Sequence, residues 1–227
     1  MFKNFSKIKY NRGLTIIELL VVVSIFVIIT GISIFNYSNF NSSISTQNLA
    51  DDIALTVRRA QGYAIGVRGI MQGFDNRYGV HFTINSDAQL PYNNGSNKSM
   101  IFFADIGDDL SHKYIYNYNE NTGQCGLPVE GDECLEVLNI KSGDEIKNIY
   151  QYTNGSNLYQ MSKEESLDIV FARPNPEPFF SDNYGELALS SVIIEVSKQD
   201  EPDAESRFIT IHKNGQISVS NKRDGGN

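Results

Sequence analysis

The side chains that could carry out chemistry in this 227-residue chain are few and widely spaced. Its three histidines, His81, His112 and His212, stand far apart, without a serine–histidine–aspartate signature, phosphate loop, HExxH motif or zinc-ligand spacing. His81 and His212 lie in alternating strand patterns, where a surface or partly buried imidazole is expected. The sequence therefore favours a protein that is not an enzyme and that binds no cofactor.

Acidic side chains gather in the stretch "FADIGDDLSH", where Asp105, Asp108 and Asp109 surround Gly107. Oxygen-rich loops of this kind can hold Ca²⁺. The spacing of an EF-hand loop is absent, and no glutamate stands at the distance that a bidentate ligand requires. We therefore expect a solvated acidic turn and no metal site.

Two cysteines, Cys125 and Cys134, lie close together in "CGLPVEGDEC". In a cytosolic protein such a pair can bind metal or cycle between redox states, but no CxxC motif or nearby histidine accompanies it. In an exported protein a small disulfide loop is the simpler interpretation. Closing that loop would contribute about 2–3 kcal/mol to the free energy of unfolding.

One carboxylate, that of Glu18, stands inside an apolar run that extends from Leu14 to Phe35. As a helix this run is about 33 Å long, which is enough to cross the hydrocarbon core of a bilayer. A carboxylate in such a segment is costly and usually marks a function. Residues 1–13 carry four basic side chains and no acid, which is typical of a cytoplasmic amino terminus with the rest of the chain exported.

Two general interpretations of this apolar segment fit it poorly. A secretory signal peptide has an apolar core of about 7–15 residues and a small-residue cleavage site, whereas this run is longer and continues into "SIFNYSNFNSS". A simple membrane anchor would span the bilayer equally well, but it leaves the carboxylate of Glu18 without a role.

The stretch "KYNRGLTIIELLVVVSIFVIITGI" resembles the class III signal of type IV pilins and type II secretion pseudopilins. The resemblance implies that a prepilin peptidase cleaves between Gly13 and Leu14 and then methylates the new amine of Leu14, where the family more often has Phe or Met. It also implies that Glu18 pairs with the terminal amine of a neighbouring subunit when the helices pack in a filament. The role of Glu18 is then in assembly.

The remainder of the chain predicts an α+β fold. In "NLADDIALTVRRAQGYAIGVRG" apolar residues recur every three or four positions, as in an amphipathic helix. From about Tyr78 the predicted strands are "YGVHFTI", "KSMIFFADI", "KYIYNYN", "EVLNIKS", "IKNIYQY", "SLDIVFARP", "LSSVIIEVS" and a hairpin in "FITIHKNGQISV". We expect a long N-terminal helix, with a transmembrane half and an amphipathic half, packed on a C-terminal antiparallel β domain.

The predicted organisation has four parts. They are a basic leader peptide that is removed (1–13), a transmembrane and filament-core helix (14–35), an amphipathic periplasmic helix (36–70) and an antiparallel β globular domain (71–227). The segments "RRAQGYAI", "YGVHF", "IVFARPNPEP" and "FITIHKNGQISV" resemble, diffusely, the H-type pseudopilins and the FimT/FimU-like minor pilins. This resemblance favours a minor pilin or pseudopilin over a major pilin.

The resemblance also implies partners and a location. The partners are other pilin or pseudopilin subunits, the prepilin peptidase, an inner-membrane assembly platform and membrane lipid. The chain would cross the inner membrane once before assembly, with its globular domain periplasmic or extracellular, and would then enter a pilus or a type II secretion pseudopilus.

Three alternatives remain open from the sequence: a major pilin, a minor pilin that takes up DNA, and a membrane-anchored binding protein outside any filament. The last needs neither Gly13 nor Glu18. A formal net charge of −8 argues against broad nucleic acid binding. Lys222 and Arg223, in "NKRDGGN", are offset by Asp224, so we expect a frayed tail there without DNA contact.

Overall fold

The computed structural model describes residues 13–66, 77–86, 95–106, 113–118, 125–126, 133–153, 158–199 and 205–223, and of residues 34–42 the backbone alone. The chain divides into two compact units, Met1–Asn41 and Ser42–Asn227, each described here by itself. Helix α1, Ile16–Ile65, runs through the first unit and opens the second. All other described elements are strands, which confirms the α+β fold with a C-terminal β domain.

In the first unit the helix is apolar on all sides from Ile16 to Ser33, apart from Glu18. Within this span the exposed fraction of the large apolar side chains runs from 49% at Val21 to 85% at Ile16. A helix that is hydrophobic all round is normally buried in a large core or in a membrane. This part of α1 therefore needs a partner from outside its own unit.

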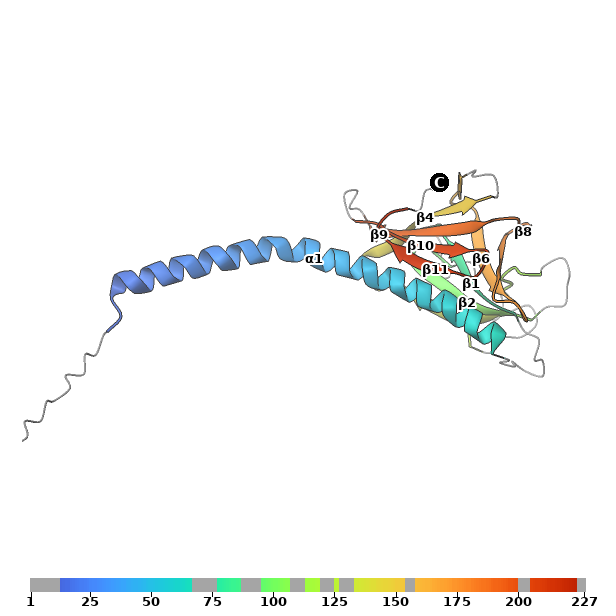
Figure 1. The fold of residues 1–227 in the computed structure, drawn as a ribbon, viewed down its shortest axis with the longest axis horizontal. Helices are drawn as coiled ribbons and strands as arrows, with labels where there is room; N and C mark the ends of the chain where they lie inside the picture. Colours follow the sequence, from blue (N-terminus) through green and yellow to red (C-terminus); the bar gives the residue numbers. More distant parts are fainter. Residues whose placement is uncertain are drawn as a thin grey trace, which may run out of the picture. The chain divides into compact units, whose positions relative to one another are not determined.

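The second unit contains two antiparallel sheets (Figure 1). In spatial order, the six-stranded sheet consists of β3 (Cys134–Asn139), β2 (Ser99–Asp105), β1 (Arg77–Thr83), β6 (Ser166–Phe171), β7 (Pro178–Asp182) and β8 (Gly185–Leu187). The five-stranded sheet consists of β11 (Ile217–Ser220), β10 (Arg207–His212), β9 (Ser191–Lys198), β4 (Asp144–Tyr152) and β5 (Leu158–Gln160). The edges of the first sheet are thus β3 and β8.

The second part of α1 packs into one core with both sheets (Figure 1). Its buried face is built from small and branched residues spaced three or four apart: Leu49, Ala50, Ile53, Ala54, Val57, Ala60 and Ala64. The four alanines keep this face flat, so the helix backbone can approach the strands closely. The predicted amphipathic stripe is therefore the one that packs, although α1 ends at Ile65 and residues 67–70 lie outside the described part.

The middle strands of the six-stranded sheet are buried on both faces. All residues of β2 and β6 are buried, because their inner face meets the main core and their outer face meets a second cluster. That second cluster contains Ile101, Phe103, Val170, Tyr116 and Cys134. The sequences of strands buried on both faces are largely apolar and lack the alternation of apolar and polar residues seen in strands with one face in solvent.

The predicted strand "KYIYNYN" is wrong in its described part, since residues 113–118 form turns and irregular backbone. Their amides bond to side chains and not to a neighbouring strand. The amide of Tyr114 donates to Asp105 (3.0 Å), that of Tyr116 to Asp168 (3.1 Å) and that of Asn117 to Glu133 (2.9 Å). Because buried carboxylates satisfy these donors, the segment lies on the sheet without joining it.

Candidate functional site

The residues predicted for processing lie immediately before α1. Gly13, Leu14 and Thr15 have no regular structure, and the helix begins at Ile16. Leu14 is 71% exposed. The peptide bond between Gly13 and Leu14 therefore stands in non-helical, exposed backbone, where a protease could bind it in extended form.

Glu18 is held in a reciprocal arrangement with Thr15. The Thr15 amide donates to the Glu18 carboxylate (3.2 Å), the Thr15 hydroxyl donates to the same oxygen (3.1 Å), and the Glu18 amide donates to that hydroxyl (3.3 Å). This is a capping box, which satisfies amides that the helix itself leaves unpaired. Sequence reasoning missed the role of Thr15, although the spacing "TIIE" carries the signal.

The helix that follows is chemically suited to lipid. Among the described residues, Ile16–Ser33 is the one helical stretch long and apolar enough to cross a membrane. Its hydroxyl groups are satisfied internally, since Ser24, Thr30 and Ser33 each donate to the carbonyl four residues earlier, at 2.8–3.0 Å. Within this span Glu18 therefore stands out as the single charged side chain.

Polar contacts fasten the second part of α1 to the β domain. Ser45 and Thr46 donate to the buried carboxylate of Asp144, with the Thr46 hydroxyl at 2.7 Å. Burial opposes ionisation of Asp144, but hydrogen bonds from Ser142, Ser45 and Thr46 outweigh it and lower the pKa of Asp144 below its ordinary value. The guanidinium of Arg207 donates to Gln47 (2.8 Å) and Ser43 (3.2 Å), which adds a second attachment.

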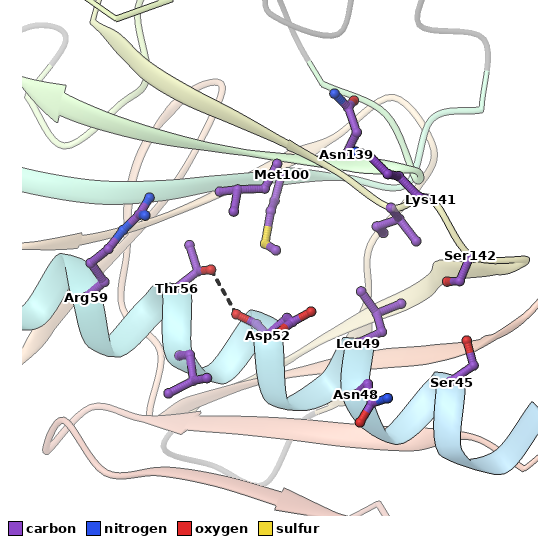
Figure 2. A pocket seen from close by; sticks show the side chains of 13 residues that line it. Ser45, Asn48, Leu49, Asp52, Thr56, Arg59, Met100, Asn139, Lys141 and Ser142 are labelled. Atoms are coloured by element: carbon purple, nitrogen blue, oxygen red, sulfur yellow. Dashed lines mark hydrogen bonds between the residues drawn. The ribbon is translucent and has the colours of Figure 1, made fainter. Parts of the chain in front are cut away.

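A groove of about 600 Å³ opens between α1 and the end of β3. Figure 2 shows Met100 reaching from the sheet toward α1, above Asp52. The charged lining residues of the groove are Arg59, Lys141 and the acid Asp52. The guanidinium of Arg59 is fixed by Glu136 on β3 (2.7 Å) and by the ring of Phe102, 4.1 Å from its centroid.

Cys125 and Cys134 are joined in a disulfide. Cys134 is buried and opens β3, and the amide of Gly126 donates to its carbonyl (3.1 Å). The bond therefore ties Cys125 and Gly126 to the edge of the six-stranded sheet. This is the structural role expected of a small disulfide loop.

Of the three acids in the stretch predicted to be a solvated turn, only Asp105 lies among the described residues. That carboxylate is buried and accepts two hydrogen bonds from the guanidinium of Arg77, at 2.7 and 2.9 Å. Asp108 and Asp109 lie outside the described residues. Within the described ranges no group of three metal-ligating side chains comes together.

The histidines follow the expectation only in part. His212 on β10 is half-buried, as expected, and His112 lies outside the described residues. His81 is buried, with 3% of its surface exposed, and its Nδ1 lies 2.7 Å from the carboxylate of Asp168. The expected surface or partly buried imidazole is wrong at His81, because residues 113–118 cover this face and place the ring of Tyr116 5.1 Å away.

The basic pair near the carboxyl end is exposed, and Arg223 lies over the ring of Tyr150, 4.8 Å from its centroid. The Lys222 amide donates to the Ser220 hydroxyl (3.1 Å). The expected fraying is therefore not seen at residues 221–223, with which the described part ends.

The comparison with known families finds one match, to the model described as the prokaryotic N-terminal methylation motif, over residues 8–34. No curated protein and no solved structure matches the chain. The matched segment contains Gly13, Leu14 and Glu18. Proteins with this motif are in general filament subunits that assemble with other pilin subunits after processing by a prepilin peptidase. The methylation motif and the apolar helix make the N-terminal segment similar to that of type IV pilin-like, prepilin-type substrates.

Proposed function

We propose that the protein is a minor pilin or pseudopilin of a type IV pilus or type II secretion pseudopilus. The prepilin peptidase hydrolyses the bond between Gly13 and Leu14 and methylates the amine of Leu14. Residues 14–35 remain in the inner membrane, and residues 36–70 and 71–227 lie in the periplasm until the subunit enters a filament. The presence of one acid, Glu18, in the otherwise uncharged span Ile16–Ser33 of α1 is the observation that carries this proposal.

The physical argument concerns the cost of Glu18 in lipid. A carboxylate at the centre of a membrane helix costs about 2.5–3.5 kcal/mol on insertion scales, and this figure is an upper bound for Glu18, which lies in the first turn of α1. The capping box supplies hydrogen bonds to that carboxylate but no positive charge. Cleavage creates an ammonium group on Leu14, so the Glu18 of a neighbouring copy gains an ionic partner when two helices pack in register.

One substitution distinguishes a filament subunit from a simple membrane anchor. Glu18→Ala should abolish incorporation into sheared surface filaments or pseudopili while leaving membrane insertion intact. Ser24→Ala serves as the control, because it also removes a polar group from the same helix. Normal filament incorporation of Glu18→Ala would show that the acid has no role in assembly.

The choice of a minor over a major subunit rests on the diffuse resemblance to the H-type pseudopilins and FimT/FimU-like pilins. Quantitative mass spectrometry of sheared filaments separates the two, because a major pilin dominates the preparation. No observation on the described residues favours a role in DNA uptake. The chain is acidic, and the guanidinium of Arg223 makes a cation–π contact with the ring of Tyr150.

A further inference from the structure

Residues 113–118, called the strap from here on, cover part of the outer face of the six-stranded sheet without pairing to it. The ring of Tyr116 packs against those of Phe103 and His81, at centroid distances of 5.2 and 5.1 Å. Tyr116 is buried and belongs to the same apolar cluster as Cys134. The strap therefore keeps water from apolar side chains of the sheet that would be exposed without it.

The carboxyl end of the strap is bonded directly beside the disulfide. The Asn117 amide donates to the carboxylate of Glu133 (2.9 Å), and the Glu133 amide donates back to the Asn117 carbonyl (3.1 Å). Glu133 is buried and directly precedes Cys134 in the chain. The residues that hold this end of the strap thus adjoin the residue that carries the disulfide.

The amino end of the strap adopts a backbone conformation that its own sequence does not favour. Tyr114 has φ +67°, in the left-handed region that residues with a side chain rarely occupy. Its ring stacks on that of Phe179, with 4.0 Å between the centroids, and its carbonyl accepts from the Ser181 hydroxyl. Because contacts with the surroundings hold the strap closed, weakening those contacts favours local opening.

The disulfide is one of these contacts. Cys125 follows the strap in the sequence and packs, half-buried, on the cluster that contains Tyr116 and Cys134. The bond between the two cysteines tethers the chain on the carboxyl side of the strap, so it restricts the conformations of the open state. Breaking the bond gives the open state conformational entropy that the closed state does not gain.

We propose that the disulfide is a redox lock on the strap. The strap lies closed on the sheet while Cys125 and Cys134 are joined, and it opens locally when they are reduced. Locking is a two-electron oxidation, in which two thiols give two electrons and two protons to a disulfide-exchange oxidant that leaves as a dithiol. In a chain made in a reducing compartment the strap closes only after export. This timing rests on the function proposed above, whereas the lock itself needs neither membrane nor filament.

Hydrogen exchange followed by mass spectrometry tests the lock on the full chain in detergent micelles. The oxidised protein is compared with the same protein reduced by dithiothreitol. Peptides that contain the amides of Tyr114, Tyr116 and Asn117 should exchange at least about tenfold faster after reduction, because a short disulfide loop restricts opening by that factor or more. Peptides from β9 and β10, in the other sheet, serve as the internal control and should be unchanged.

Two outcomes of this comparison would overturn the proposal. Unchanged exchange of the strap after reduction means that the disulfide does not hold it. Equal acceleration of the strap and of β9 and β10 means that the disulfide stabilises the whole domain and locks no single segment.

Thiol labelling provides a second measurement without a reductant. Cys125→Ala leaves the buried thiol of Cys134 free, and a maleimide should label it only as the strap opens. The matched control is the thiol introduced by Val192→Cys, which is buried in the main core, in a chain that also carries Cys125→Ala and Cys134→Ser. We expect Cys134 to react at least about tenfold faster than this control thiol.

Equal labelling rates, or no labelling of Cys134 in the folded protein, would contradict the lock. Neither result depends on cleavage after Gly13, which the amino-terminal mass of the same samples reports separately. A chain cut at Leu14 whose strap stays closed after reduction refutes the lock and leaves the filament role standing. An uncut chain whose strap opens on reduction supports the lock and refutes the processing.

Discussion

The two parts of α1 differ in what covers their apolar side chains. Around Val23 the helix is apolar on every side and half or more exposed, whereas Ile53 and Val57 are fully buried against the two sheets. Among the described residues of its own unit the first part has no packing partner, and the second part packs on the β domain. One helix thus serves two environments, and its sequence changes from all-apolar to amphipathic between them.

The largest expected effect comes from shortening a side chain on the packed face. Ile53→Ala leaves a cavity in the core and should lower the free energy of unfolding of the β domain by about 2–5 kcal/mol. Val23→Ala, in the apolar part, should leave that quantity unchanged. Chemical denaturation followed by near-ultraviolet circular dichroism in detergent measures both, and equal effects would contradict the division of α1 into two environments.

A smaller effect is expected at the polar attachment of the packed half. Asp144→Asn removes the charge that accepts the hydroxyls of Ser45 and Thr46, and should cost about 1–3 kcal/mol. Asp51→Asn is the control, because Asp51 is an exposed side chain whose carboxylate bonds only within the helix, to Gln47. The same denaturation experiment compares the two variants, and a similarly small change in both would mean that Asp144 does not fasten the helix.

The same carboxylate gives the β domain a pH dependence. The folded protein lowers the pKa of Asp144, so its contribution is complete above the unfolded pKa of about 3.9 and is lost as the pH falls through the folded value. Stability should therefore decline below about pH 4 in the wild type and decline less in Asp144→Asn. Parallel pH profiles of the two proteins would show that other groups cause the decline.

The smallest expected effect is at the start of the exposed half. Thr15→Val removes the hydroxyl of the capping box and should destabilise the first helical turn by about 1 kcal/mol. Hydrogen exchange in detergent micelles measures this destabilisation, and we expect faster exchange at the amides of residues 16–18 in Thr15→Val. Thr30→Val, whose hydroxyl bonds within the helix, should leave those amides unchanged.

Sequence patterns predicted the parts of the fold that depend on local periodicity. The packed stripe through Leu49, Ile53 and Val57 and the long strands β4, β9 and β10 follow from spacing alone. The short strands β5, β7 and β8 were missed, since three to five residues give too little pattern to recognise. Residues 113–118 were misassigned because their aromatic alternation reflects packing over a sheet and not pairing within one.

For the candidate sites too, the sequence predicted what depends on one short segment and missed what depends on segments far apart in the chain. Gly13, Leu14 and Glu18 could be found because a motif sets their spacing within one short segment. The groove could not, since it joins α1 to the end of β3 across some ninety residues of sequence. Burial of His81 was missed for the same reason, because the segment that covers it is distant in the chain.

The central claim is that Glu18 is tolerated in lipid because cleavage supplies a positive amine on neighbouring copies. Intact-mass and peptide mass spectrometry of the protein isolated from its own cells tests that claim most directly. We predict an amino terminus at Leu14 that carries one added methyl group. An amino terminus at any other residue, or a chain that retains residues 1–13, would contradict it.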